Sequence, residues 1–402
     1  MTTTATDAVL DAFARTTQQT YSPGELRALL SSGRQLRIKY GVDVTAPFLH
    51  IGHAVNLWMM RRLQDMGHRV LFLIGDFTTR IGDPTGRNKA RPVIPPAEIE
   101  ANAERFIAQA RMVLRFDDPN LLEIRRNSEW YDAMPAGELL RLLSFVTHAR
   151  LAARDMFQAR MAEGLDIHMH EMIYPVLQGY DSWALGSDLT IIGTDQLFNE
   201  MLGRFIQEKL GQPPQVIITT KITPGLDGKA KQSKSLGNYV GLGHSPRDQY
   251  GRLMTLPDAL IPEYLRVYTE MPLAQVAEVE SRLAADPLAC KHLLAHAVVA
   301  RYHGEAVAGR ERDWFIATFS QRQAPSDMPE VRVAAVPLPA IEVLSRHFGA
   351  ARSKSALRRL FQQRAVTCDG ATLTQPDDII APQDGMIFQV GKRAWFCLRV
   401  DA

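Results

Sequence analysis

Residues 36–76 contain a strand, a helix and a second strand in succession, and this order constrains the fold more than any other feature of the sequence. The segment 36–43 alternates apolar and polar residues, as a half-buried strand does. Apolar residues recur every three or four positions through 51–66 and stop at Gly67, which is typical of an amphipathic helix. The next segment, 68–76, is almost continuously apolar, as in strands of parallel sheets. The sequence therefore predicts a βαβ unit in an α/β, Rossmann-like doubly wound domain.

The rest of the chain divides into segments of different pattern. Strand signals recur at 188–193 and 215–220, so the sheet-forming domain is predicted over 34–240, with a mostly helical insertion at about 95–164. Before this domain we predict a helical N-terminal arm (1–33). After it we predict a second helical domain (241–330), a proline-containing linker (331–339) and a small α+β module (340–402).

Charge and cysteine content exclude several classes of protein. The 402 residues carry 46 Lys and Arg against 44 Asp and Glu, a net charge of +2, which excludes a polycation that binds nucleic acid by bulk charge. The apolar run 70–74 is far shorter than the ~20 residues of a membrane span, and the N-terminus lacks a signal-peptide pattern, so we expect a cytoplasmic protein with no membrane partner. Three scattered cysteines predict neither disulfides nor a zinc site, and His168 with His170 is interpreted as a helix start, so no protein-built metal site is expected.

The segment His50-Ile51-Gly52-His53 places two imidazoles at the opening of the helix predicted over 51–66. A helix N-terminus attracts phosphate through its free N–H groups and its dipole. Both imidazoles could donate hydrogen bonds to charge that develops on a phosphoryl group, and Gly52 leaves the backbone open to a nucleotide. The alternative interpretation is a pair of surface histidines at an ordinary helix start.

A second motif, Lys231-Gln232-Ser233-Lys234-Ser235, lies roughly 180 residues later in a loop rich in lysine and glycine. Taken alone, such a loop is usually only solvated. Ammonium groups on a mobile loop could also stabilise the β- and γ-phosphates of ATP as pyrophosphate leaves. The pairing of H-I-G-H with K-x-S-K-S favours this second interpretation.

With both motifs, the sequence resembles the class I aminoacyl-tRNA synthetases and, most closely, the bacterial tyrosyl-tRNA synthetase family. The resemblance runs from about residue 36 to 400 and includes further motifs at 75–78, 81–87, 174–181 and 193–199. It implies ATP-dependent activation of L-tyrosine to tyrosyl-adenylate and transfer of the tyrosyl group to the terminal ribose of tRNA(Tyr). It also implies Mg²⁺ that accompanies ATP, and a homodimer whose interface we expect in the helical insertion.

The same resemblance implies a role for each motif residue. It implies that the ammonium of the amino acid is held by Asp83, Tyr174 and Gln178, that the phenol hydroxyl is held by Asp181, and that Gln196 lies beside the carboxylate. Two further tyrosine-binding positions are Asp43 and Lys39, the second of which is a tyrosine in some relatives. The positions implied for ATP are Gly41, Gly52, Arg87, Arg91, Gly193, Asp195 and Ser233, and those implied for catalysis are Thr45, His50, His53, Lys231 and Lys234.

The spacing of Tyr174, Gln178 and Asp181 agrees with a tyrosine site. At positions i, i+4 and i+7 they share one face of a helix, where they form a polar stripe beside an aromatic ring. Such a stripe suits a ligand with a cationic end and a hydroxyl end. The alternative is a capped helix whose Asp181 is only solvated.

The C-terminal module, from about residue 339, carries nine basic and six acidic side chains, a net charge of +3. The segment 353–360 predicts a helix with one basic and one apolar face, followed by a turn at 368–370 and strands around Phe388 and Trp395. The module resembles a small RNA-binding module that also occurs in a ribosomal small-subunit protein. It implies salt-sensitive binding of tRNA phosphates, with the 241–330 helical domain on the anticodon side.

Three positions depart from the family pattern, because Val44, Ile192 and Gln232 stand where proline, glycine and methionine are usual. Together with Lys39, they keep open an alternative function, that of a paralogue which activates a tyrosine analogue. A second alternative is a non-catalytic RNA-binding relative, which the retention of both histidines and the loop lysines disfavours. A tryptophan enzyme is disfavoured because the basic C-terminal module is not part of that family's usual plan.

Overall fold

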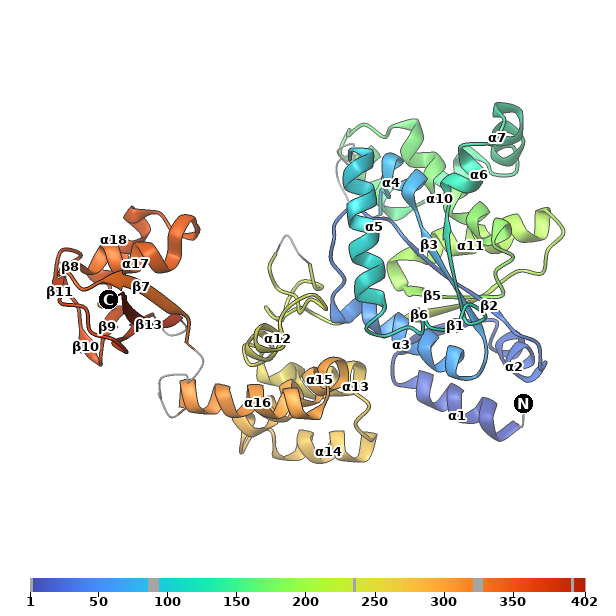
Figure 1. Cartoon of the computed structure of the whole chain (residues 1–402). Coiled ribbons are helices and arrows are strands. Elements are labelled where there is room, and N and C mark those ends of the chain that lie inside the picture. Colours follow the sequence, from blue (N-terminus) through green and yellow to red (C-terminus); the bar gives the residue numbers. More distant parts are fainter. Residues whose placement is uncertain (1–2, 86–93, 234–235, 321–327, 392–393, 402) are drawn as a thin grey trace. The chain divides into compact units, whose positions relative to one another are not determined.

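The computed structural model describes residues 3–85, 94–233, 236–320, 328–391 and 394–401. The chain divides into two compact units, residues 1–308 (unit 1) and 309–402 (unit 2) (Figure 1). This division falls within the last helix of the predicted 241–330 domain rather than at its end. The other predicted domain boundaries stay predictions.

Unit 1 contains a six-stranded sheet of order β1-β6-β5-β2-β3-β4. Strands β2 to β6 are parallel, and β1 pairs antiparallel with β6. The strands are β1 (Thr17–Tyr21), β2 (Arg37–Val42), β3 (Arg69–Ile74), β4 (Leu122–Arg126), β5 (Leu189–Gly193) and β6 (Val216–Thr220). The sheet confirms the predicted α/β fold class. Because the chain continues to opposite sides of β2, with β3 and β4 on one side and β5 and β6 on the other, a crevice is expected at the carboxyl ends of β2 and β5.

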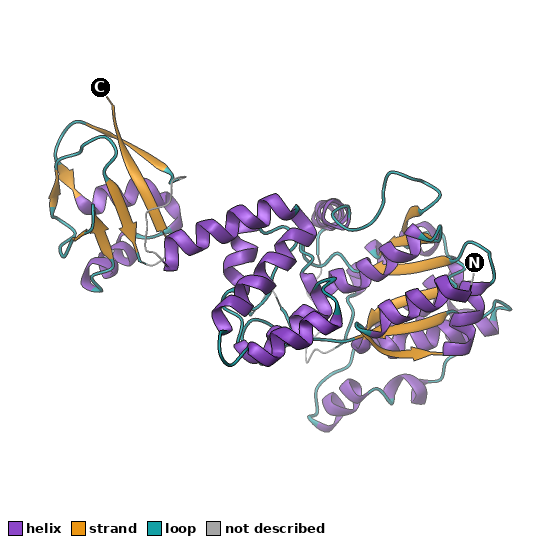
Figure 2. Cartoon of the chain, turned by 90° about the horizontal axis from the view of Figure 1, so that it is seen from below, coloured by secondary structure: helices purple, strands orange, loops and turns teal. Residues whose placement is uncertain are grey.

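Helices lie on both sides of the sheet, which explains why strands such as β3 are apolar along almost their whole length (Figure 2). The predicted helix between β2 and β3 is confirmed as α3 (Ile51–Asp65). The polar stripe of the sequence lies on α10 (Met169–Ala184), which packs along α11 (Leu197–Lys209). The remaining helices before β5 are α1 (Thr3–Ala14), α2 (Pro23–Ser31), α4 (Asp76–Ile81), α5 (Pro96–Ala110), α6 (Ser128–Tyr131), α7 (Ala136–Leu143), α8 (His148–Ala152) and α9 (Asp155–Ala162).

Residues 246–315 are mostly helical. They contain α12 (Pro246–Leu253), α13 (Ile261–Tyr268), α14 (Leu273–Arg282), α15 (Pro287–His303) and α16 (Glu305–Phe315). None of the helices within the described ranges is both long and apolar enough to cross a membrane.

Three stretches predicted without strands contain at least one. The helical arm 1–33 includes β1, whose Thr17–Tyr21 segment adds to the edge of the sheet beside β6. The helical insertion 95–164 includes β4, which adds to the opposite edge beside β3. The predicted linker 331–339 is wrong at both ends, because β7 (Glu330–Ala334) buries Val331 and Val333, and β8 (Leu338–Pro339) pairs with a later strand. In all three, a strand of only five residues gains its stability from pairing with a neighbour, which local sequence does not reveal.

Unit 2 is a small α+β module. Its five-stranded sheet has the order β10-β9-β12-β13-β7, formed by β7 with β9 (Val366–Cys368), β10 (Ala371–Thr372), β12 (Ile387–Val390) and β13 (Ala394–Asp401). A separate pair joins β8 (Leu338–Pro339) and β11 (Ile379–Ile380). The predicted basic helix is confirmed as α18 (Lys354–Gln362), capped by Ser353, and it packs with α17 (Ala340–Phe348). Phe388 and Phe396 stack in the core of the module.

Candidate active site

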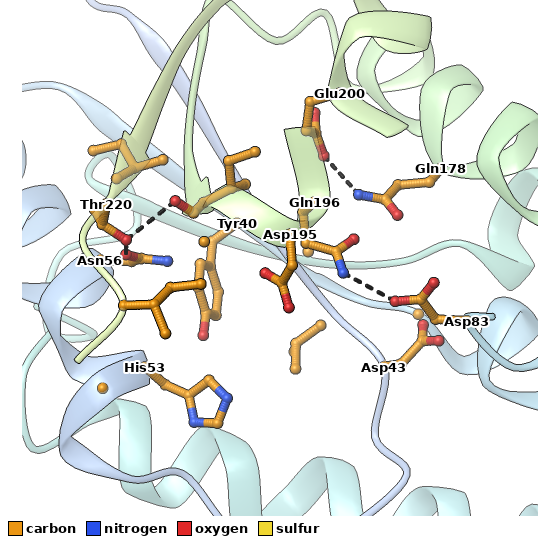
Figure 3. A pocket seen from close by; sticks show the side chains of 18 of the residues that line it. Tyr40, Asp43, His53, Asn56, Asp83, Gln178, Asp195, Gln196, Glu200 and Thr220 are labelled. Atoms are coloured by element: carbon orange, nitrogen blue, oxygen red, sulfur yellow. Dashed lines mark hydrogen bonds between the residues drawn. The ribbon is translucent and has the colours of Figure 1, made fainter. Parts of the chain in front are cut away.

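A cavity of about 360 Å³ lies at the carboxyl ends of β2, β3, β5 and β6 (Figure 3). It brings together fifteen of the predicted site residues, namely Lys39, Gly41, Asp43, Thr45, His50, Gly52, His53, Asp83, Tyr174, Gln178, Asp181, Gly193, Asp195, Gln196 and Lys231. Ser233 does not line the cavity, and its backbone N–H donates to the side chain of Asn238. The predicted residues Arg87, Arg91 and Lys234 lie outside the described residues. Both motifs of the sequence therefore contribute to one site.

His50 and His53 form a reciprocal cap at the N-terminus of α3. The backbone N–H of Gly52 donates to Nδ1 of His50 at 3.1 Å, and the backbone N–H of His50 donates to Nδ1 of His53 at 3.3 Å. Since Nδ1 accepts in both rings, a neutral imidazole carries its proton on Nε2 in each. A Cβ at position 52 would lie 2.9 Å from the His50 ring. Gly52 is therefore needed for the cap itself, in addition to the predicted access for a nucleotide.

Both imidazoles are neutral at physiological pH. Desolvation, followed by the charges of His53 and Lys231, lowers the pKa of His50 well below its ordinary value. His53 is exposed at the mouth of the cavity, yet its ring is surrounded by protein atoms of the cavity wall. Desolvation by these atoms lowers the pKa of His53 to about 4. The two rings, whose centroids are 3.8 Å apart, thus offer uncharged N–H donors next to the helix N-terminus.

Lys231, from the second motif, lies in the same cavity as the imidazoles. Its ammonium is 2.9 Å from Oδ2 of Asp195, and 60% of the side chain is exposed. Its neighbour Gln232 is buried and donates to the hydroxyl of Tyr268 at 2.8 Å. Gly193 leaves room for the carboxylate of Asp195, because a Cβ at this position would lie 2.8 Å from Oδ1. This end of the cavity therefore combines a cation, neutral donors and a helix N-terminus, which together suit a polyphosphate.

The opposite end of the cavity is rich in hydrogen-bond acceptors. The hydroxyl of Tyr174 donates to Oδ2 of Asp43 at 2.9 Å, and burial raises the pKa of Tyr174, which keeps this hydroxyl protonated. Nε2 of Gln196 donates to Oδ2 of Asp83 at 3.0 Å, as Figure 3 shows. Two buried or partly buried carboxylates and an amide oxygen in this region suit an ammonium group.

Asp181 is buried at the cavity wall, with 4% of its surface exposed. It accepts hydrogen bonds from Nε1 of Trp130 at 3.0 Å and from Nδ2 of Asn127 at 3.3 Å. Burial raises the pKa of Asp181 to about 7, although the positive charge of Lys39 acts in the opposite direction. A buried carboxylate that is already held by two donors has acceptor capacity left for a hydroxyl.

Lys39 lines the cavity, but its ammonium is occupied by other side chains. It donates to Oγ of Ser182 at 2.7 Å and to the two carboxylate oxygens of Glu200 at 3.0 and 2.8 Å. The side chains of Lys39 and Glu200 are each only 2% exposed. Direct contact of Lys39 with the amino acid stays a prediction, since its observed role is to neutralise Glu200.

Sequence reasoning missed several residues that shape the cavity. Asn127 and Trp130 lie just after β4, in a stretch predicted to be helical, and so gave no signal of a site. Glu200 lies one turn before Gly203 and two turns before Gln207, on the buried side of α11. A glutamate in phase with the buried side of an amphipathic helix is the signal that could have identified it.

No cluster of three or more His, Cys, Asp or Glu side chains within the described ranges is arranged to hold a metal ion.

Comparisons with known proteins agree with this geometry. Residues 31–320 match the family described as tRNA synthetases class I (W and Y). The tyrosine–tRNA ligase of Moorella thermoacetica is 43% identical over 375 residues, which cover 92% of this chain and 89% of that protein. The tyrosine–tRNA ligase of Thermotoga maritima is 40% identical and covers 93% of both chains.

Solved structures show the same fold at lower identity. A C-terminally truncated mitochondrial tyrosyl-tRNA synthetase from Aspergillus nidulans matches with a TM-score of 0.63 and 22% identity, over 76% of this chain and 92% of that one. A tyrosyl-tRNA synthetase from Archaeoglobus fulgidus, complexed with L-tyrosine, matches with a TM-score of 0.60 and 22% identity, over 78% of this chain and 100% of that one. With two motifs in one cavity and close relatives over nearly its whole length, the chain belongs to the class I tRNA synthetases of the tryptophan and tyrosine family, among the tyrosine–tRNA ligases.

Proposed function

We propose that this chain is a tyrosine–tRNA ligase, which activates L-tyrosine with ATP and transfers the tyrosyl group to tRNA(Tyr). The supporting observation is one cavity with two chemically different ends. One end holds the imidazoles of His50 and His53 with the ammonium of Lys231, and the other holds Asp83, Gln178 and Asp181. A polyphosphate and an amino acid that carries a hydroxyl fit these ends in a single orientation.

At the amino-acid end, Asp83 and the amide oxygen of Gln178 would accept hydrogen bonds from the tyrosine ammonium. Asp181 would accept the phenol hydroxyl, and Gln196 would lie beside the reacting carboxylate. Phenylalanine would leave the buried Asp181 without this partner, a basis of selectivity known for tyrosyl-tRNA synthetases in general.

At the phosphate end, the chain would stabilise charge on the leaving group. In the first step, a carboxylate oxygen of tyrosine bonds to the α-phosphorus of ATP, and the bond from that phosphorus to the pyrophosphate oxygen breaks. Negative charge then collects on pyrophosphate, where the Nε2–H groups of His50 and His53 and the ammonium of Lys231 would donate. Lys234, Arg87 and Arg91 are proposed to join them on the strength of the family resemblance. In the second step, a hydroxyl oxygen of the terminal ribose of tRNA bonds to the tyrosyl carbonyl carbon, and the bond from that carbon to the phosphate oxygen breaks. AMP then leaves with the proton of the hydroxyl.

ATP would bring Mg²⁺ with it. The cavity contains several carboxylates but lacks, among its described residues, a grouped set of three metal ligands. This donor set fits an ion that is carried mainly by phosphates rather than by a protein cage, and that neutralises part of the phosphate charge.

The remaining partners are proposed from surface features. Exposed basic side chains on α18 of unit 2, among them Arg358 and Arg359, would contact tRNA phosphates. A homodimer interface in the helical insertion is supported by apolar side chains that remain exposed there. These include Leu140 and Met161, at 67% and 45% exposure. A cytoplasmic location stays a prediction.

The deciding experiment is amino-acid-dependent exchange of radiolabelled pyrophosphate into ATP, followed by charging of tRNA(Tyr). Exchange is expected with tyrosine and not with phenylalanine or tryptophan. Strong exchange with a tyrosine analogue and none with tyrosine would instead identify a paralogue, the alternative suggested by Val44, Ile192 and Lys39. Absence of exchange with every aromatic amino acid would identify a non-catalytic relative.

A further inference from the structure

The carboxylate of Glu200 collects four hydrogen bonds inside unit 1. Two come from Lys39, at 3.0 and 2.8 Å, one from Nε2 of Gln178 at 2.8 Å, and one from Nε2 of Gln215 at 2.7 Å. A carboxylate buried to this extent is tolerated only when its charge is neutralised and its lone pairs are occupied. Lys39 supplies the charge, and the two glutamine amides complete the set of donors.

These contacts fix which way the amide of Gln178 points. Its nitrogen donates to Glu200, and its oxygen accepts from Nδ2 of Asn199 at 2.7 Å. Figure 3 shows the nitrogen of Gln178 turned toward Glu200 and its oxygen turned toward the side of the cavity that holds Gln196 and Asp83. An amide oxygen has two lone pairs, so one remains for a donor in the cavity.

The orientation of this amide decides the sign of its interaction with an ammonium group. With the oxygen toward the cavity, Gln178 accepts a hydrogen bond from a cation. With the amide rotated by half a turn, two N–H donors would face that cation and repel it. Because Glu200 accepts hydrogen bonds and donates none when ionised, it stabilises only the first orientation.

We infer that Glu200 is a positioning residue for the amino acid, because it holds the oxygen of Gln178 toward the substrate ammonium while Lys39 neutralises its charge. The inference rests on the proposed function, in which Gln178 contacts the ammonium of tyrosine. Glu200 itself acts through Gln178 and does not need to touch the substrate.

The test compares ligands with and without an ammonium group. In the double variant Lys39→Met/Glu200→Met, both buried charges are removed together, so neither is left unpaired. We expect the Kd of tyrosine, and the inhibition constant of tyramine, to rise by about 10- to 100-fold, the range for a hydrogen bond to a charged group. The inhibition constant of 3-(4-hydroxyphenyl)propionate, which lacks the ammonium, should rise by about tenfold less than the other two constants. Loss of the Lys39 charge also acts on Asp181, but it affects the phenol contact that all three ligands share. The rate of exchange at saturating tyrosine should fall by a smaller factor than the affinity for tyrosine does.

Two further variants keep the outcome interpretable. Lys39→Met/Glu200→Gln keeps the shape of the Glu200 side chain and leaves no buried charge unpaired, so it replaces the first double variant if that protein does not fold. It should weaken binding of the two ammonium ligands in the same way but by a smaller factor, because the new amide can both accept from and donate to Gln178. In a Gln178→Met background, the loss of tyrosine affinity caused by the double variant should disappear. Glu208→Gln, on the exposed side of the same helix, is the matched control and should alter no constant.

An equal loss of affinity for all three ligands, or undiminished loss in the Gln178→Met background, would overturn the inference. Unchanged tyrosine affinity in a folded variant would overturn it as well. These outcomes differ from failure of the proposed function, in which the unmodified protein would show no tyrosine-dependent exchange.

Discussion

Replacement of Asp181 by asparagine should change how the stability of the ligand-free protein depends on pH. Asp181 is 4% exposed, and burial raises its pKa to about 7 from an ordinary 3.8. The folded protein therefore holds this proton more tightly than the unfolded chain does. The stability that comes from the protonated group is fully present below about pH 4 and is lost as the pH rises through 7.

The expected size follows from the two pKa values. One pKa unit corresponds to about 1.4 kcal/mol of differential interaction. Between pH 5 and pH 8, ionisation of Asp181 should lower the free energy of unfolding by about 2 to 3 kcal/mol. Asparagine does not titrate, so Asp181→Asn lacks this loss. The substitution adds a constant offset, because Trp130 and Asn127 donate to different oxygens of the carboxylate and asparagine has only one oxygen, but this offset does not depend on pH.

The assay is urea unfolding of the full chain at pH 5, 6.5 and 8, with pulsed hydrogen exchange at the amides of α10 so that the signal reports on unit 1. The free energy of unfolding of Asp181→Asn minus that of the unmodified protein should be about 2 to 3 kcal/mol larger at pH 8 than at pH 5. Asp132→Asn removes an exposed carboxylate two residues after Trp130 and should show no such gain in the free energy of unfolding. A difference between Asp181→Asn and the unmodified protein that stays constant over this range would refute the reasoning.

Three further predictions concern catalysis and tRNA binding. In the unmodified protein, the KM of tyrosine in pyrophosphate exchange should be about tenfold higher at pH 6 than at pH 8, because ionised Asp181 is the better acceptor for the phenol hydroxyl; a flat profile would contradict this. Lys231→Met should slow adenylate formation at least about 100-fold in single-turnover measurements, while the affinity for tyrosine stays unchanged. Lys229→Met, in the same loop but outside the cavity lining, should change neither the rate nor the affinity. Equal loss of rate and affinity in Lys231→Met would argue against a transition-state role. Arg358→Gln/Arg359→Gln should weaken tRNA binding and make it less sensitive to salt in filter-binding titrations, with pyrophosphate exchange unchanged; an unaltered salt dependence would count against phosphate contacts on α18.

The sequence alone determined the features that are local in the chain. Periodic apolar residues predicted β2, α3 and β3, and the i, i+4, i+7 spacing placed Tyr174, Gln178 and Asp181 on one helix. The residue types of the two motifs predicted a phosphate-binding helix start and a cationic loop. Such features depend on the conformation of a few neighbouring residues, so their spacing carries the information.

The tertiary structure decided which distant residues meet. Strands β1, β4 and β7 have weak local signals and exist because a neighbouring strand pairs with each of them. The pairing of Lys39 with Glu200 joins residues 161 positions apart, across the β5-β2 junction of the sheet and onto α11. Neither residue is predictable as a partner of the other, because a buried charge is stable only beside its counter-charge, and strand order sets where that counter-charge lies. The chemistry of the two motifs was therefore encoded in sequence, whereas the surroundings that orient Gln178 and shift the pKa of Asp181 arise only from packing.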